Sequence, residues 1–380
     1  MGDQNITEKS RLLIAPLDWG LGHATRCIPI IRQALQSGAD VFLAGEGPTA
    51  NLLHTEFPQL PLLPLKGYEI QYGKNKLELI GKLLLQIPKI IDAMDEEHDW
   101  LHTAVDQYGL HGVISDNRYG LYSDKIPSII ITHQLLVKTG MGGKADRMLQ
   151  KLHYGYIQSF NECWVPDVAT SPSLAGELAH PPVLPATKVQ YIGTLSRFAN
   201  PSQKPLKHLL ILLSGPEPQR TLLEKSLVAQ LGNYKGEVVL VRGLPDSKET
   251  LELAPHVMVF NHLPAAALEV VIKEAHFVIA RTGYSTVMDL MALRKKSILI
   301  PTSGQTEQEY LAEHLMEQRF ALCISQDRFR LGSALDLAGS FPYNFPETLS
   351  DSALKDAIDG LLQTVSNHPV NPPSSPNPWP

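Results

Sequence analysis

The chain has 380 residues, enough for two domains of ordinary size, each with its own core. Its formal net charge of −6, without a long basic block, argues against a nucleic-acid partner, and its three scattered cysteines argue against a disulfide framework or a zinc site. The polar start and the lack of an apolar run of about 18 residues predict a cytoplasmic protein with neither signal peptide nor spanning helix.

Short apolar runs alternate with helical segments along the first half of the chain. The runs cover residues 12–17, 41–44, 112–115, 128–132 and 189–192. Runs of this kind, without polar alternation, suit parallel strands that helices cover on both faces.

The same series begins again in the second half. Its runs cover residues 208–213, 238–241, 257–260, 277–280, 297–301 and 321–324. Two such series predict an α/β protein with two doubly wound, Rossmann-like parallel-sheet domains that face a central cleft. We expect the domains at 11–195 and 205–365, followed by a disordered Pro-rich tail at 366–380.

The turn after the first strand reads Gly-Leu-Gly-His. Gly20 and Gly22 permit positive φ angles and close approach of a ligand to the backbone. His23 then lies at the mouth of a helix, where an imidazole can take a proton from a hydroxyl near neutral pH. An ordinary strand-to-helix turn with an exposed histidine fits the same pattern. Arg26 either holds a phosphate or covers the helix.

Two more strand ends carry polar residues that we expect at the same cleft. Asp116, Asn117 and Arg118 follow one buried strand, and His133 follows the next. Ligands of α/β sheets are met at these strand ends, which favours a functional role. The alternatives are a capping role for Asp116 and a hydrogen-bonded core position for His133.

In the second half, Ser214 and Gly215 follow the first strand and precede a helix whose N-terminus can cradle a diphosphate. Arg220 can add positive charge, or can be a solvated residue of the first helical turn. The loop is not a Walker A motif, because the Gly-Lys-Ser/Thr ending is missing.

The segment 280–308 is the most informative part of the chain. Gly283 breaks a buried strand, and a helix then begins near Ser285 or Thr286, with free N–H groups suited to an anion. Asp289, one helical turn further on, can accept the two hydroxyls of a ribose. Gln308 and Glu309 follow the next strand, where they can meet sugar hydroxyls. These features predict a nucleotide-sugar site, to which we also assign His262 and Arg281.

A basic, apolar stretch precedes the third run of the first half. Residues 74–91 are rich in Leu and Ile and carry four lysines. An amphipathic basic segment can dock on an anionic membrane, although a core-facing helix with solvated lysines is the commoner cause. Peripheral contact with the inner face of the cytoplasmic membrane is the resulting expectation.

Taken together, these residues resemble the GT-B glycosyltransferases, nearest to the MurG-like family 28 enzymes that transfer N-acetylglucosamine to lipid-linked acceptors. The family's Arg-Ser-Gly-Ala-x-Thr-Val-x-Glu segment is matched by residues 281–289, with Asp289 at the implied ribose position. Its Gln-Gln-Tyr corresponds to residues 308–310, with Glu309 replacing the second Gln. Its Gly-Gly-His loop, His-Glu-Gln and Gly-Asn-Pro-x-Arg segments correspond to residues 20–23, 133–134 and 193–197.

The resemblance implies an N-terminal acceptor-binding domain and a C-terminal domain that binds a UDP-sugar donor. It implies transfer of N-acetylglucosamine or another hexose, with inversion, to a lipid-linked or glycan acceptor. His23 is the implied general base, assisted by Asp116 or His133. No Asp-x-Asp pair for a divalent ion is present, so we expect a metal-independent reaction without a cofactor, with UDP-sugar as a substrate.

Two other functions fit the same residues. The Gly-x-Gly-His-x-x-Arg form of the first loop also looks like that of the UDP-sugar hydrolases of the pseudaminic acid pathway, in which water takes the place of the acceptor. A non-catalytic module that binds a nucleotide-sugar is the third possibility.

Overall fold

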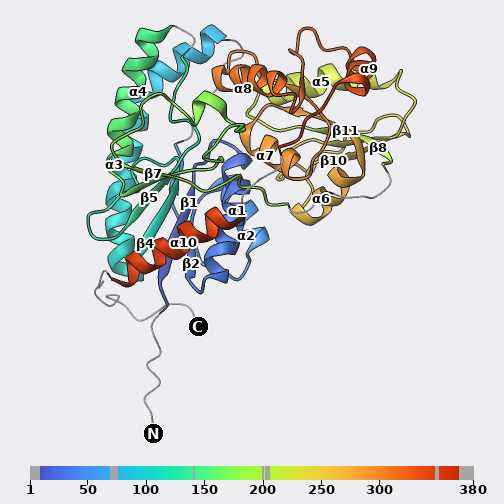
Figure 1. The fold of residues 1–380 in the computed structure, drawn as a ribbon. Coiled ribbons are helices and arrows are strands. Elements are labelled where there is room, and N and C mark those ends of the chain that lie inside the picture. The colour runs from blue at the N-terminus through green and yellow to red at the C-terminus, as the bar shows by residue number, and fades with distance from the viewer. Residues whose placement is uncertain are drawn as a thin grey trace.

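The computed structural model describes residues 9–68, 76–139, 142–198, 201, 206–346 and 351–367. Two lobes lie side by side in Figure 1, and each contains one parallel sheet. This arrangement confirms the prediction of two doubly wound α/β domains.

The first lobe contains a seven-stranded sheet in the order β3-β2-β1-β4-β5-β6-β7. Its strands are β1 (Arg11–Pro16), β2 (Asp40–Gly45), β3 (Leu62–Pro64), β4 (Gly112–Asp116), β5 (Ser128–Ile131), β6 (Glu162–Val165) and β7 (Lys188–Tyr191). Its helices are α1 (Leu21–Gln36), α2 (Gly47–Glu56), α3 (Lys76–Tyr108), α4 (Gly143–Ile157) and the short η1 (Gly176–Leu178). The central strands β1, β4 and β5 are almost wholly buried, as parallel strands covered on both faces must be.

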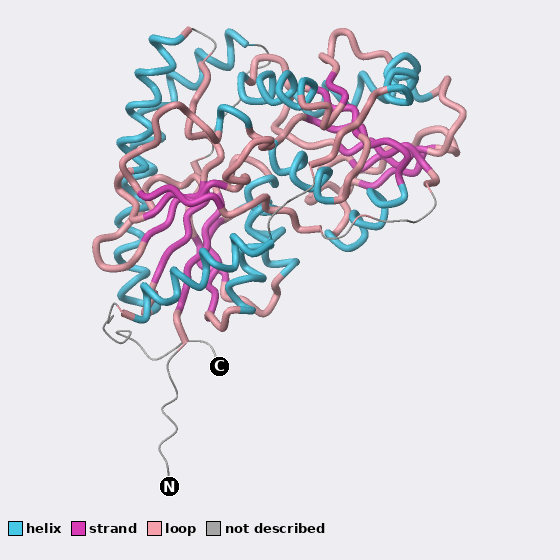
Figure 2. Tube along the Cα trace, in the orientation of Figure 1, coloured by secondary structure: helices cyan, strands magenta, loops and turns pink. Residues whose placement is uncertain are grey.

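The second lobe contains a six-stranded sheet in the order β10-β9-β8-β11-β12-β13. Its strands are β8 (His208–Leu212), β9 (Val238–Val241), β10 (Val257–Phe260), β11 (Ala275–Arg281), β12 (Ser297–Ile300) and β13 (Leu322–Cys323). The helices that follow them are α5 (Gln219–Leu231), α6 (Ala265–Glu274), α7 (Tyr284–Ala292), α8 (Thr306–Glu317) and α9 (Leu331–Ser340). Figure 2 shows both sheets enclosed by helices.

The last described helix, α10 (Asp351–Ser366), returns to the first lobe. Ser37 at the end of α1 donates a hydrogen bond of 2.6 Å to Asp359, and Val365 lies against Gly112 of β4. The expected division placed residues up to 365 in the second domain, whereas the contacts of this helix place it on the first. The apolar face of α10 packs against the first lobe. The local sequence does not specify which lobe a helix packs against. Residues 368–380, most of the predicted tail, lie outside the described residues.

The lobes share apolar contacts where α1 meets α7. One buried cluster runs from Ile28 and Ile31 of α1 to Val287 and Met288 of α7. The N-terminal ends of these two helices therefore meet at the interface between the lobes. In the part of the chain described here, no helix is both long enough and apolar enough to cross a bilayer.

Candidate active site

The centre of the site is a histidine and an aspartate that follow neighbouring strands. His23 lies in the first turn of α1, the helix that follows β1 after a four-residue turn, and Asp116 is the last residue of β4. Because β1 and β4 pair in parallel, with Pro16 opposite Asp116, both side chains lie at the same edge of the sheet. His23 Nδ1 lies 3.2 Å from Asp116 Oδ2.

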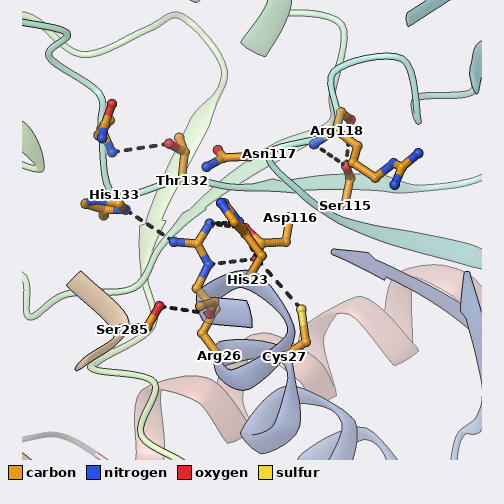
Figure 3. A network of polar contacts seen from close by, with 12 residues as sticks. His23, Arg26, Cys27, Ser115, Asp116, Asn117, Arg118, Thr132, His133 and Ser285 are labelled. Atoms are coloured by element: carbon orange, nitrogen blue, oxygen red, sulfur yellow. Dashed lines mark hydrogen bonds and ion pairs between the residues drawn. The ribbon is translucent and has the colours of Figure 1, made fainter. Parts of the chain in front are cut away.

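Arg26 joins this pair to a second histidine, as Figure 3 shows. Its Nε donates to Asp116 Oδ2 at 2.7 Å, and its Nη2 donates to the other carboxylate oxygen. Its Nη1 lies 3.3 Å from His133 Nδ1. The structure thus brings together four residues that the sequence singled out at three different strand ends.

Burial and charge set the ionisation of this cluster. Burial opposes ionisation of Asp116, yet the adjacent Arg26 and His23 bring its pKa down to about 2. Burial and the charge of Arg26 lower the pKa of His23, against the raising effect of Asp116. His23 is therefore neutral at pH 7, as a general base must be. Burial raises the pKa of the neighbouring Cys27 well above its usual value, so this thiol stays protonated.

His133 connects the cluster to the second lobe. Its Nε2 lies 2.9 Å from Glu307 Oε1, in the first turn of α8, and its ring stacks on Tyr284 with centroids 4.2 Å apart. Both partners come from the second lobe. Glu307 was not among the predicted site residues, although its place in a polar loop after a buried strand was a usable signal.

Asn117 and Arg118 follow Asp116, but only Asn117 contacts the cluster around Arg26. Asn117 has a φ of 57°, and with its amide nitrogen turned toward Thr132 its oxygen accepts from Arg26 Nη2 at 3.1 Å. Arg118 is fully buried and donates to Glu97 Oε1 at 2.6 Å, so it lies behind the predicted cleft loop and not on its surface. Its role here is to hold that loop.

The start of α7 lies against the start of α1. Ser285 Oγ donates to the carbonyl of Gly22 at 2.9 Å, and a Cβ on Gly22 would lie 3.2 Å from that hydroxyl. Gly283 is the N-cap of α7 and provides no side-chain cap, so the first-turn N–H groups beside Ser285 and Thr286 remain suited to an anion.

Asp289 is held by the segment that joins the lobes. Its carboxylate accepts from Ser196 Oγ at 2.8 Å and from Arg197 Nε at 3.1 Å, and it is 6% exposed. His262, after β10, is partly buried, and burial together with the charge of Arg197 lowers its pKa. Both predicted donor residues therefore lie close to Arg197.

The two arginines assigned to the donor site are buried. Arg281 donates to the carbonyls of Ile300, Pro301 and Gln219, and burial lowers its pKa to about 10. Arg220 donates to Glu224 Oε2 at 2.8 Å. Both side chains brace the loops at the carboxyl ends of the second sheet.

Other predicted donor residues lie in those loops. Ser214 and Gly215 form the turn between β8 and α5, where Gly215 has a φ of 103° that favours glycine. Gln308 accepts from the backbone N–H of Thr302 at 2.9 Å, and Glu309 accepts from that of Gly304 at 2.8 Å. These side chains stabilise the loop before α8.

The described residues contain no group of three or more His, Cys, Asp or Glu side chains arranged to hold a metal ion. Metal independence stays a prediction.

Comparison with known proteins identifies the second half. Residues 215–355 match the glycosyltransferase family 28 C-terminal domain. No curated protein matches the chain in sequence.

Solved structures of glycosyltransferases share the whole fold. The glycotransferase of kitacinnamycin is 17% identical, with a TM-score of 0.61 over 95% of this chain and 96% of its own. The calicheamicin glycosyltransferase CalG4 is 13% identical, with a TM-score of 0.58 over 95% of each chain. The spinosyn rhamnosyltransferase SpnG is 17% identical, with a TM-score of 0.56 over 95% of this chain and 97% of its own.

The two-sheet architecture is the GT-B fold of these structures. More particularly, the chain carries a glycosyltransferase family 28 C-terminal domain in its second lobe.

Proposed function

We propose that this protein is an inverting, metal-independent glycosyltransferase that moves a hexose from a UDP-sugar to a lipid-linked or glycan acceptor. N-acetylglucosamine is the first sugar to test. The observation that carries the proposal is the contact of His23 Nδ1 with Asp116 at the point where the lobes meet.

This contact supports a specific reaction. A proton on Nδ1 is donated to Asp116, which leaves the Nε2 lone pair for the proton of an acceptor hydroxyl. The hydroxyl oxygen attacks the anomeric carbon from the face opposite the diphosphate. The bond between that carbon and the diphosphate oxygen breaks, UDP leaves with the electron pair, and the configuration inverts.

The second lobe offers positive charge for the leaving UDP. The N-terminal turn of α7 faces the first lobe beside Gly22, and the buried Arg281 lies at the end of the preceding strand. A helix N-terminus and a buried guanidinium both stabilise developing negative charge. We place the diphosphate at Ser285 and Thr286, with Gly215 on its other side.

An exposed apolar face supports a lipid-linked acceptor. Met148, Leu149 and Leu152 of α4 are 70%, 39% and 54% exposed, and Lys144 and Lys151 lie on the adjoining strip of the helix. An apolar stripe beside basic residues is suited to the boundary of an anionic membrane.

Part of α3 lies near α4, with Tyr119 between the two helices. Tyr119 packs in one apolar cluster with Ile90 of α3, and its ring lies 6.0 Å from that of Tyr156 of α4. Ile87 and Ile91 of α3 are 46% and 43% exposed. Residues 74 and 75 and the side chains of 76–85, which belong to the predicted contact segment, lie outside the described residues.

The test is release of nucleotide from a panel of nucleotide-sugars, with and without a membrane-lipid extract. Release that needs the extract and disappears in His23→Ala establishes transfer to a lipid acceptor. Equal release without the extract establishes the hydrolase. Binding of UDP without release from any donor establishes a binding module, and the proposal is then wrong.

A further inference from the structure

Five side chains form a continuous polar chain from the second lobe to the proposed base. Glu307 contacts His133, His133 contacts Arg26, and Arg26 and His23 both contact Asp116. Of these five only Glu307 belongs to the second lobe, and the side chain of His133 is 6% exposed.

His23 Nδ1 has two competing partners. It can donate to Asp116 Oδ2 at 3.2 Å, which leaves Nε2 bare and basic. Alternatively it can accept from Arg26 Nη2 at 2.9 Å, which puts the proton on Nε2 and removes the base. One Nη2 proton of Arg26 goes to Asp116 Oδ1, and the acceptor of the second Nη2 proton therefore decides whether His23 can act.

His133 holds the other terminal nitrogen of the guanidinium. Arg26 Nη1 lies 3.3 Å from His133 Nδ1, and only a bare Nδ1 can accept from a guanidinium. The proton of neutral His133 must then be on Nε2, which lies 2.9 Å from Glu307 Oε1. An ionised carboxylate only accepts. Burial opposes ionisation of Glu307, but the hydrogen bond with His133 and the charge of Arg26 lower its pKa, so Glu307 is ionised at pH 7.

With Nη1 held by His133, the remaining Nη2 proton of Arg26 has an acceptor other than His23. The Asn117 amide oxygen, when its nitrogen faces Thr132, lies 3.1 Å from Arg26 Nη2. If His133 carried its proton on Nδ1, it would repel Arg26 Nη1 and favour the contact of the guanidinium with His23.

We propose that Glu307 is a positioning residue that acts through His133 and Arg26 to keep His23 in the tautomer with a bare Nε2. The inference rests on the proposed function, in which His23 is the base. Because Glu307 lies on α8, the basic tautomer forms only while the second lobe is docked as it is here. Catalytic competence is thereby coupled to the contact between the lobes.

Neighbouring contacts hold α8 in this position. Thr306 Oγ1 donates to the carbonyl of Lys138 at 2.5 Å, and Tyr310 OH accepts from the backbone N–H of Glu177 at 2.7 Å. Gly176 permits this approach, because a Cβ there would lie 2.9 Å from the His314 ring. Loss of the Glu307 carboxylate alone leaves these contacts in place.

The direct test is the ring nitrogen spectrum of protein labelled with ¹⁵N-histidine, recorded with and without UDP. His23→Ala and His133→Ala assign the two rings. We expect His133 protonated on Nε2 and His23 on Nδ1, and a shift of His23 toward the Nε2-protonated form in Glu307→Leu. Glu307→Gln, whose amide oxygen can still accept, restores the wild-type pattern. The exposed Glu313→Leu on the same helix is the control.

Kinetics give an independent readout. General-base catalysis contributes about 10²–10⁴-fold, and we expect Glu307→Leu to lower kcat about tenfold with an unchanged Kd for UDP. In a His133→Ala background the same substitution should have no further effect, because its route to Arg26 is gone.

The inference is wrong if the histidine tautomers are unchanged in Glu307→Leu, both with and without UDP. It is also wrong if Glu307→Leu lowers kcat as much in the His133→Ala background as in the wild type. The spectra need neither donor sugar nor acceptor. A tautomer shift in a protein that transfers no sugar would therefore leave the positioning role standing and reject the proposed function alone.

Discussion

Asp289 and Arg197 form an ion pair of 3.1 Å that ties α7 to the segment between the lobes. Ser196 Oγ donates to the other carboxylate oxygen at 2.8 Å. The carboxylate of Asp289, which we predicted to bind the ribose, is thus already hydrogen-bonded to Ser196 and Arg197. Ribose hydroxyls have the same chemistry as the Ser196 hydroxyl, and can replace it while Arg197 stays bound.

This exchange makes a prediction about affinity. Hydrogen bonds to charged groups contribute about 1.5–3 kcal/mol, so Asp289→Ala should weaken UDP binding about tenfold or more. Ser196→Ala should bind UDP at least as tightly as the wild type, because the ribose then has no competitor. Calorimetric titration with UDP measures both. Wild-type affinity in Asp289→Ala would mean that Asp289 serves the linker only.

The second prediction concerns pH. Burial and Arg26 lower the pKa of His23, so its neutral, basic form persists below the ordinary value of 6.5. We expect kcat/KM to stay level from pH 7 down to 6.5 and to decline only in more acid solution. Asp116→Asn removes the group that raises this pKa, so the decline should move to still lower pH while kcat falls at every pH. A wild-type midpoint above pH 7 would contradict the assignment of His23 as base.

The third prediction tests whether Arg118 stabilises the fold or binds the acceptor. Arg118 and Glu97 are both almost fully buried and paired at 2.6 Å. Removing one partner of a buried ion pair costs about 3–5 kcal/mol, so Arg118→Met should lower the free energy of unfolding by this order in urea titrations. The double variant with Glu97→Met should recover part of the loss. An unchanged free energy with weakened acceptor binding would instead favour the predicted role on the cleft surface.

The fourth prediction tests the apolar face of α4. Wild-type protein should sediment with vesicles that contain anionic phospholipid, less so at high salt, and Leu152→Asp should abolish this binding. Met258→Asp, at a residue of β10 in the second lobe that is 58% exposed, is the matched control. Equal binding of both variants, or none by the wild type, would reject membrane contact through α4.

Much of the fold could be predicted because parallel strands leave a strong local signal. The apolar runs at 112–115 and 277–280 lie within β4 and β11, and the helix expected near Ser285 begins at Tyr284. β3 and β6 were not predicted. β3 has three residues and ends in proline, and β6 has four and begins with Glu162, so neither provides a long enough run.

The site was predictable to the extent that strand ends define it. His23, Asp116 and His133 come together because β1, β4 and β5 are neighbours in one sheet. The contact of His133 with Glu307 joins residues 174 positions apart and depends on how the lobes dock, which no local pattern encodes. The burial of Arg220 and Arg281 could not be predicted from the sequence either, because arginine is ordinarily a surface residue.

The most direct test of the account compares turnover and donor affinity in His23→Ala. With a donor and an acceptor that the wild type uses, we expect kcat to fall by about 10²-fold or more while the Kd for UDP stays within about twofold of the wild type. Substantial transfer by His23→Ala would contradict the central claim that the histidine beside Asp116 is the base.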